Sequence, residues 1–262
     1  MTLIITAIAV VTVIGVICAV MLSAASKVMA VEVDERIPQV RECLPGANCG
    51  GCGYPGCDGY AAALVADEGL SLTLCAPGGA AAASAISAVL GREAGEMQKR
   101  AALVHCGGDC EKTKKKADFA GSQSCAAAKL LFSGDGACSF GCLGYGDCAG
   151  VCPEDAICIK DGLARVIPER CIACGKCVKT CPQRLISLIP ESAVTAIRCS
   201  SRDKGPAVKA KCAAGCIGCG LCSKKCPETA ITMDNNLPGI DYEKCTGCGA
   251  CAQACPVKCI HM

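Results

Sequence analysis

Three cysteine runs in this chain share one spacing, C-x2-C-x2-C-x3-C-P, and span residues 171–182, 216–227 and 245–256. Three cysteines two residues apart can turn inward around one iron–sulfur cube, and a fourth, just before a proline, ligates a second cube. The proline lacks an N–H group and has a fixed φ, so the chain leaves the fourth ligand in a set direction. The spacing therefore predicts [4Fe–4S] clusters.

A stretched run, C-x3-C-x5-C-x3-C-P, precedes these three over residues 138–153. The four runs form two ferredoxin-like units in series, and in each unit the first three cysteines of one run join the last cysteine of the other. The first unit is predicted to hold one cluster on Cys138, Cys142, Cys148 and Cys181 and another on Cys171, Cys174, Cys177 and Cys152. The second unit is predicted to hold one on Cys216, Cys219, Cys222 and Cys255 and another on Cys245, Cys248, Cys251 and Cys226.

A fifth group lies nearer the N-terminus, where Cys49, Cys52, Cys57 and Cys75 have the spacing C-x2-C-x4-C-x17-C. Glycines surround the first three, and glycine permits the close backbone approach that a cluster requires. These four cysteines are predicted to bind one [4Fe–4S] cluster. Cys43, six residues earlier, is expected to be a spare buried thiol.

Five more cysteines have no partner in the repeat, namely Cys106, Cys110, Cys125, Cys199 and Cys212. They could hold a further cluster assembled from two regions of the chain, or they could be free buried thiols. The sequence leaves both readings open and does not say which four would be ligands. The cofactor prediction is therefore five [4Fe–4S] clusters, with a sixth left open. Cys158 and Cys259 are expected to pack near the clusters.

The composition favours a metal-stabilised protein, because 29 cysteines accompany only 3 phenylalanines, 4 tyrosines and no tryptophan. So little aromatic volume leaves bound metal as a main source of folding free energy. Structural zinc is the competing metal, since zinc sites also use CxxC pairs. A secreted disulfide scaffold is disfavoured, because the cysteines follow ferredoxin spacing and no cleavable signal peptide is evident.

The elements that must position these sites begin with residues 3–25, which contain no charged side chain. At about 1.5 Å per residue this run can cross a hydrocarbon core of about 30 Å. We therefore expect an uncleaved N-terminal transmembrane helix, with Cys18 as a small apolar side chain within it. Low-potential clusters assemble in a reducing compartment, which favours a cytoplasmic C-terminal side.

The predicted fold class is α+β: the transmembrane helix, a small α-rich [4Fe–4S] domain, then two tandem bacterial-type 2[4Fe–4S] ferredoxin-like units. The expected divisions are residues 1–26, 27–105, 106–195 and 196–262, with the cysteine-rich segment that precedes the first unit included in the third. Helices are expected over residues 60–67 and 80–90, and a strand over 101–104. Residues 154–157 and 228–231 should begin helical turns that lead into strands, followed by strands at 165–167 and 239–241, in βαβ-type units.

One combination of motifs is more distinctive than the ferredoxin runs. It consists of an uncharged N-terminal run followed by Asn48-Cys49-Gly-Gly-Cys52-Gly-Tyr-Pro-Gly-Cys57 and Cys75-Ala-Pro-Gly-Gly79. This combination resembles the B subunit of the Rnf complex, an ion-translocating ferredoxin:NAD oxidoreductase. The resemblance covers nearly the whole chain. The segment from Cys199 to Cys212 is similar to the longer form of that protein.

The resemblance implies a prokaryotic plasma membrane, a single membrane pass, and partner subunits that are integral to the membrane, bear flavin or hold iron–sulfur clusters. It also implies that soluble ferredoxin donates electrons, which the chain passes to those subunits. Membrane lipid is an expected contact, and nucleic acid is not an expected partner.

A chain with five or more clusters is expected to relay electrons, since an isolated [4Fe–4S] cluster stores one electron and does no bond chemistry. No nucleophile–base pair and no phosphate-binding glycine loop is evident, so no catalytic residue for hydride chemistry is predicted. His105 and His261 are the two histidines, and a surface role is expected for each. The alternative functions are a stand-alone membrane-tethered polyferredoxin and a structural zinc protein.

Residues 198–225 carry a concentration of positive charge that could steer an acidic ferredoxin toward the chain. The basic residues are Arg198, Arg202, Lys204, Lys209, Lys211, Lys224 and Lys225, against the single acid Asp203. The alternative is that these lysines only offset the negative charge of the clusters. A second lysine run, Lys112 and residues 114–116, is the next surface to consider.

Overall fold

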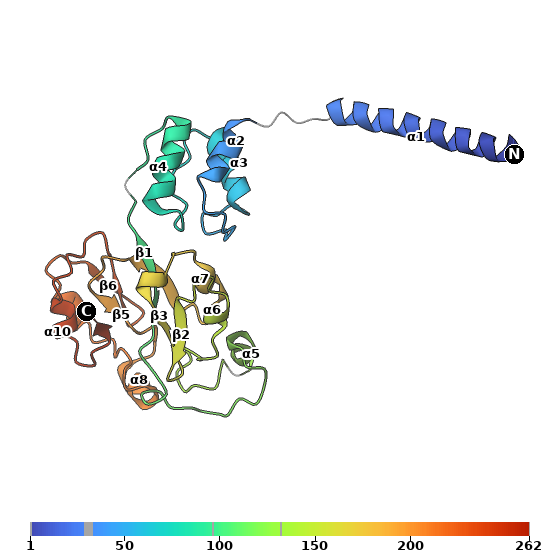
Figure 1. Cartoon of the computed structure of the whole chain (residues 1–262). Helices are drawn as coiled ribbons and strands as arrows, with labels where there is room; N and C mark the ends of the chain where they lie inside the picture. The colour runs from blue at the N-terminus through green and yellow to red at the C-terminus, as the bar shows by residue number, and fades with distance from the viewer. Residues whose placement is uncertain (1, 29–33, 96, 132, 262) are drawn as a thin grey trace.

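The structure is a computed structural model of residues 1–262, and it describes residues 2–28, 34–95, 97–131 and 133–261. A group of three helices, α2 to α4, stands beside a larger region that contains all of the short strands (Figure 1). The three helices form the N-terminal cluster domain, and the strands belong to the two ferredoxin-like units.

The first helix, α1, comprises Thr2–Val28, and its described side chains are exposed. Among the described residues, no helix is both long enough and apolar enough to cross a membrane. The N-terminal transmembrane helix expected from the sequence is therefore not supported by the structure.

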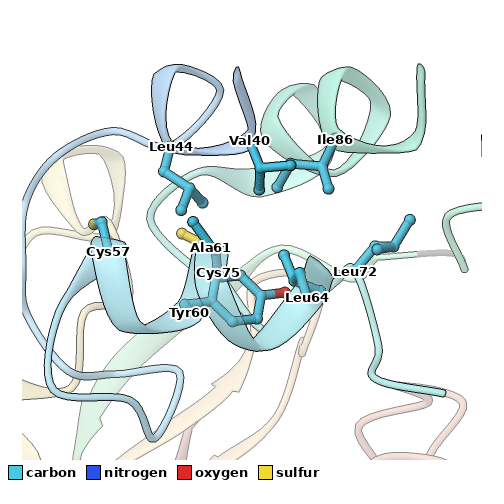
Figure 2. Packing of buried hydrophobic residues seen from close by; sticks show 9 residues of the cluster. All are labelled: Val40, Leu44, Cys57, Tyr60, Ala61, Leu64, Leu72, Cys75 and Ile86. Atoms are coloured by element: carbon cyan, nitrogen blue, oxygen red, sulfur yellow. The ribbon is translucent and has the colours of Figure 1, made fainter. Parts of the chain in front are cut away.

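Three helices form the N-terminal cluster domain: α2 (Arg36–Glu42), α3 (Cys57–Ala66) and α4 (Gly79–Leu90). The helices expected over residues 60–67 and 80–90 are confirmed, and α4 ends at Gly91 with φ of 65°. Val40, Tyr60 and Ile86 are almost completely buried between the three helices (Figure 2). Tyr60 also donates a hydrogen bond of 2.9 Å to the Ser71 carbonyl, so the phenol is both packed and satisfied.

Both ferredoxin-like units are built from antiparallel two-stranded sheets. In the first unit, β1 (Arg100–Val104) pairs with β4 (Ile186–Pro190), and β2 (Ile157–Lys160) pairs with β3 (Leu163–Val166). In the second unit, β5 (Ala196–Ile197) pairs with β8 (Ile260–His261), and β6 (Ile231–Asp234) pairs with β7 (Leu237–Ile240). The division expected after residue 105 is crossed by the pairing of β1 with β4.

The βαβ-type interpretation is wrong, because a βαβ unit requires parallel strands joined by a crossover. Two-residue turns join the hairpins instead, Asp161-Gly162 in one unit and Asn235-Asn236 in the other, and all four residues have positive φ. Turns with two positive φ angles match the twist of a hairpin. The expected helical turns at 154–157 and 228–231 are non-helical turns that lead directly into β2 and β6.

A short helix follows a glycine in each of the four cysteine runs. These helices are α6 (Asp147–Gly150), α7 (Lys176–Thr180), α9 (Leu221–Lys224) and α10 (Ala250–Gln253). The preceding glycines, Gly146, Gly175, Gly220 and Gly249, have φ between 68° and 88°. This left-handed conformation is costly for other residues, so the glycine determines where each helix begins. The third cysteine of each run lies within that helix and is buried.

Three further elements lie outside these repeats. They are α5 (Cys125–Leu130), the 3₁₀-helix η1 (Pro168–Arg170) and α8 (Gly205–Lys211). Helix α5 begins at Cys125 and α8 ends next to Cys212, two cysteines that have no place in the sequence repeat. Their positions bring these cysteines to the cluster sites described below.

Candidate iron–sulfur sites

The N-terminal domain gathers Cys49, Cys52, Cys57 and Cys75 around one cavity. Asn48, with φ of 45°, accepts a hydrogen bond of 2.8 Å from the Cys57 amide on its side-chain oxygen. This bond fixes the start of α3 against the loop that carries the first two cysteines. Four thiols around one space is the donor set that a [4Fe–4S] cluster uses.

The second unit places Cys226, Cys245, Cys248 and Cys251 around another cavity. Three of these belong to the last run and one to the run before it, which is the exchange of ligands expected from the sequence. Thr195, 1% exposed, reaches the same cavity, and its hydroxyl lies 3.7 Å from the Cys245 thiol.

Cys152 and Cys171 lie close to the thiol of Cys177 in the first unit, together with Cys174. Burial and these neighbouring thiols raise the pKa of Cys177 to about 11. The Ala156 amide donates to Cys152 Sγ at 3.3 Å and the Ala102 amide donates to Cys171 Sγ at 3.4 Å. Such N–H donors stabilise thiolate sulfur, and positive iron would supply the remaining compensation.

The other site of the first unit is formed by Cys142, Cys148 and Cys181 with Cys125, all of which line one cavity. Cys138, expected here from the sequence, lines a different cavity. Asp147 explains why Cys125 occupies the place expected for Cys138, because the Asp147 carboxylate accepts hydrogen bonds of 2.9 Å from the amides of Cys125 and Ala126. These bonds hold the start of α5 against α6, next to Cys148.

In the remaining group of the second unit, Cys216 and Cys219 lie near Cys222, and an additional thiol, Cys259, contacts both Cys216 and Cys255. Cys259 is buried, and its sulfur lies 3.6 Å from that of Cys255. A hydrogen bond from the Cys259 thiol lowers the pKa of Cys216. Cys259 therefore contacts the predicted ligands directly, as the sequence analysis expected of a residue that packs near a cluster.

The cysteines without repeat partners separate into two groups. Cys106, Cys199 and Cys212 line one cavity together with Cys138, whereas Cys125 lines the cavity of the first unit and Cys110 is exposed. Burial raises the pKa of Cys106 to about 12. A second repeat in the sequence indicates this grouping, since Cys138-x2-Gly-Cys142 in the first unit has the same spacing as Cys212-x2-Gly-Cys216 in the second.

The other cysteines lie away from these cavities. Cys43 donates to the Gln39 carbonyl at 3.3 Å in α2, Cys158 is exposed on β2, and Cys18 is exposed on α1. The surface role expected for His105 is not supported, because its ring is half-buried and contacts the Ile197 carbonyl and the Ser187 hydroxyl. Within the described residues, no three His, Cys, Asp or Glu side chains converge as they would around a single metal ion.

Neighbouring sites are linked through short pieces of backbone. Cys177 and Cys181 belong to different sites of the first unit but lie one helical turn apart, and the Cys181 amide donates to the Cys177 carbonyl at 3.1 Å. The N-terminal domain contacts the same unit, because a Cβ on Gly51 would lie 2.8 Å from the Cys174 carbonyl oxygen. Lys179 also donates to the Gly50 carbonyl at 3.1 Å.

Comparison with known families is consistent with these groups of thiols. Residues 44–77 match the family described as "Putative Fe-S cluster", and residues 170–231 and 213–262 match two families described as "4Fe-4S dicluster domain". The two dicluster matches overlap, which agrees with the shared spacing of the last three cysteine runs.

Three curated relatives align with most of the chain. The B subunit of the Na⁺-translocating ferredoxin:NAD⁺ oxidoreductase complex of Acetobacterium woodii is 44% identical over 94% of this chain and 74% of its own length. The B subunit of the proton-translocating complex of Clostridium ljungdahlii is 40% identical over 88% of this chain and 82% of its own length. The B subunit of the ion-translocating oxidoreductase complex of Methanosarcina acetivorans is 39% identical over 93% and 92%.

The chain belongs to the family of Rnf B subunits. Because these alignments include 88–94% of the chain, the likeness to Rnf B subunits extends over the N-terminal cluster domain and both ferredoxin-like units. The resemblance stated from the cysteine motifs is thereby confirmed.

Proposed function

We propose that this chain is the iron–sulfur relay subunit of an ion-translocating ferredoxin:NAD⁺ oxidoreductase. It accepts electrons from reduced ferredoxin and passes them to partner subunits of the complex. The observation that carries the proposal is that neighbouring thiol-lined sites are in contact. Gly51 of the N-terminal site contacts Cys174 of the first unit, and Cys177 and Cys181 join the two sites of that unit. A bound [4Fe–4S] cluster would supply storage of one electron at each site.

The chain's own residues position and tune these sites. Backbone amides and threonine hydroxyls donate to cysteine sulfur, and such hydrogen bonds set cluster potential together with charge and solvent exposure. We propose ligands for five clusters from the five thiol groups, with Cys125 replacing Cys138 in the first unit. The rival reading as structural zinc predicts colourless protein with zinc and no sulfide.

The first test is anaerobic purification with measurement of iron and acid-labile sulfide, followed by reduction with ferredoxin that has itself been chemically reduced. The relay requires at least about twenty irons per chain, from five cubes of four, and bleaching of the visible absorbance when reduced ferredoxin is added. Iron-loaded protein that reduced ferredoxin cannot bleach would contradict the proposed donor.

Ligand exchange within the first unit can be tested with Cys181→Ala. This variant should lose about four irons and the spectrum of the site that contains Cys142 and Cys148, while the site formed by Cys171, Cys174 and Cys177 remains. Cys158→Ala, an exposed thiol on β2, is the matched control and should keep all of its iron. Loss of the Cys171 site instead would reverse the assignment.

Membrane attachment is supported by two observations, the uncharged run at residues 3–25 and the exposure of the described α1 side chains. We propose that α1 attaches the chain to a prokaryotic plasma membrane, with the cluster domains on the cytoplasmic side. Deletion of residues 2–28 should move the chain from the membrane fraction to the supernatant without loss of iron. A deletion variant that stays with the membrane would assign attachment to another surface.

A stand-alone polyferredoxin is the alternative function. The relay proposal predicts that the tagged chain co-purifies with integral-membrane and flavin-bearing subunits in mild detergent. A carrier would instead purify alone while keeping its clusters.

A further inference from the structure

Four cysteines from both ferredoxin-like units line one cavity at their junction: Cys106 and Cys138 from the first unit, Cys199 and Cys212 from the second. We propose that these four thiolates bind a sixth [4Fe–4S] cluster, shared by the two units, which carries electrons from one to the other. Only the electron-carrying part rests on the relay function proposed above, since the cluster itself depends on the thiols alone.

Cys106 and Cys199 occupy equivalent places in the two units. β1 and β5 each pair with the last strand of their unit, β4 and β8, and the cysteine follows two residues after the strand ends. One residue separates the strand from the cysteine in each unit, and its amide is bonded in the same way. The His105 amide donates to the Leu185 carbonyl at 2.7 Å, and the Arg198 amide donates to the Cys259 carbonyl at 2.8 Å. Two equivalent strands thus deliver two thiols to one place.

Cys138 and Cys212 are a second equivalent pair. Each lies four residues before the first cluster cysteine of its unit, Cys142 or Cys216, with a glycine directly before that cysteine. The segment of residues 112–116 lies between the two: the Ala137 amide donates to the Lys114 carbonyl at 2.7 Å and the Ala213 amide to the Lys112 carbonyl at 2.8 Å. This segment connects the ends of the two units and holds their thiols at the same cavity.

Hydrogen bonds to the sulfur atoms follow the same pseudo-symmetry. The Cys142 amide donates to Cys106 Sγ at 3.4 Å, and the Cys216 amide donates to Cys199 Sγ at 3.2 Å. The Thr113 hydroxyl donates to Cys212 Sγ at 3.3 Å. Donors directed at sulfur favour the thiolate, which is the form that binds iron.

A partly buried cationic side chain also lines this cavity. Arg198 is one of its lining residues, and its Nε atom is buried with no hydrogen-bond partner among the described residues. A buried donor without a partner is costly, and a cation is compensated by a nearby anion. A [4Fe–4S] cube with four thiolate ligands is anionic, so a cluster bound in this cavity would supply the negative charge that compensates the Arg198 guanidinium.

The junction site also completes the series of sites along the chain. Cys142 and Cys216 are predicted ligands of the sites on either side, and their own amides contact the junction sulfurs. An electron that crosses the junction oxidises the cluster on one side by one electron and reduces the next by one electron, and no bond is formed or broken.

The ligand set can be tested by iron content, using Cys106→Ser, Cys212→Ser and the double variant, each prepared anaerobically. Wild-type protein should hold about 24 irons, six cubes of four, and each single variant should lose about four. The double variant should also lose only about four, because both cysteines hold the same cluster. Cys158→Ser is the control and should lose none.

A second pair of double variants decides where Cys138 belongs. Cys138→Ser with Cys106→Ser should lose about four irons, whereas Cys138→Ser with Cys148→Ser should lose about eight, from two cubes. The opposite pattern would return Cys138 to the first unit and overturn the proposal. Single variants at Cys106 and Cys212 that lose no iron would overturn it as well.

If the serine variants lose all of their iron through misfolding, Thr113→Val provides the test. It leaves every thiol in place and removes one hydrogen bond to Cys212, so one cluster of six should shift its midpoint potential downward. An unchanged set of potentials would then contradict a cluster at this site. Wild-type protein that holds six clusters but takes no electrons from reduced ferredoxin would leave the site established and reject the relay function alone.

Discussion

The hydroxyl of Thr195 is a single group whose removal should change one cluster potential. It is buried and lies 3.7 Å from Cys245 Sγ, and a metal-bound sulfur has no proton, so threonine must donate. Hydrogen bonds to sulfur stabilise the more negative, reduced cluster. Thr195→Val should lower the potential by about 40 mV, taking about 1 kcal/mol for the bond and 59 mV per tenfold change for one electron.

Redox titration followed by electron paramagnetic resonance measures this shift. Thr232→Val is the matched control, because Thr232 is exposed on β6 of the same unit. If both variants shift equally, or neither does, the hydrogen bond from Thr195 does not tune the site.

At the scale of single residues, local spacing predicted which thiols lie together around the cavities at Cys49 and at Cys245. It could not place Cys125, which reaches Cys148 because Asp147 binds the start of α5 from 22 residues away. Local spacing contains no information on that contact. The stretched run between Cys142 and Cys148 does indicate that a ligand is absent there, since x5 replaces the x2-C-x2 of the other runs.

The start of each short helix depends on a glycine with positive φ, and this can be tested at Gly175 before α7. Its φ is 73°, and an added Cβ would meet no atom within 4 Å, so a substitution there changes backbone strain alone. Gly175→Ala should destabilise the first unit by about 1–2 kcal/mol. The measurement is the temperature at which the visible cluster absorbance is lost under anaerobic conditions.

Gly150→Ala is the matched control, because Gly150 also has open space around it but ends α6 without a positive φ. Alanine is the better helix former, so this variant should be as stable as wild type or slightly more stable. Equal loss of stability in both variants would show that the left-handed conformation is not the cause.

At the scale of secondary structure, helices α3 and α4 and strand β1 could be predicted from alanine-rich and apolar runs of sufficient length. The hairpins are not predicted, because the segment after each Cys-Pro pair also suits a helical turn. Asp161-Gly162 is a hairpin signal of the kind that requires positive φ, and it lies between the two strands that it joins. Four-residue strands are too short for periodicity alone to identify.

The contact between the N-terminal cluster domain and the first unit is the feature of the whole molecule most open to test. A Cβ on Gly51 would lie 2.8 Å from the Cys174 carbonyl oxygen, so Gly51→Ala must push the two parts apart. We expect unchanged iron content but slower electron transfer between the N-terminal site and the rest, because the added methyl group lengthens the distance between them. Rapid-freeze spectroscopy after mixing with reduced ferredoxin would measure this.

Gly53→Ala separates this effect from a general disturbance of the loop. Gly53 lies in the same cysteine-rich segment, and a Cβ there would meet no atom within 4 Å, although its φ of 91° makes the backbone strained. Slower transfer in Gly51→Ala but not in Gly53→Ala would support the contact. The same rate in both would mean that electrons do not pass there.

Ferredoxin docking concerns the charge distribution over α8 and its surroundings. Lys211 forms an ion pair of 2.8 Å with Asp203, whereas Lys204 and Lys209 are exposed. Substitutions at Lys204 and Lys209 therefore test docking without breaking that ion pair. Lys204→Glu with Lys209→Glu should slow reduction by an acidic ferredoxin about tenfold at low salt and less at high salt, because ions screen the attraction. Stopped-flow absorbance measures the rate.

Lys160→Glu with Arg170→Glu makes the same change in net charge on exposed residues of the first unit. This control should reduce the rate much less. If both double variants slow the reaction equally, only the net charge matters and the docking surface lies elsewhere, with the lysines of residues 112–116 next to be tested.

The cavity at the junction takes its four cysteines from positions that span 106 residues of sequence at their widest, Cys106 to Cys212. During synthesis, the N-terminal domain and the first unit can each receive iron as soon as they leave the ribosome. The junction cannot, because two of its ligands do not yet exist. Its cluster must therefore follow those of the N-terminal domain and the first unit, and it can precede those of the second unit, whose last ligand, Cys255, is synthesised later still.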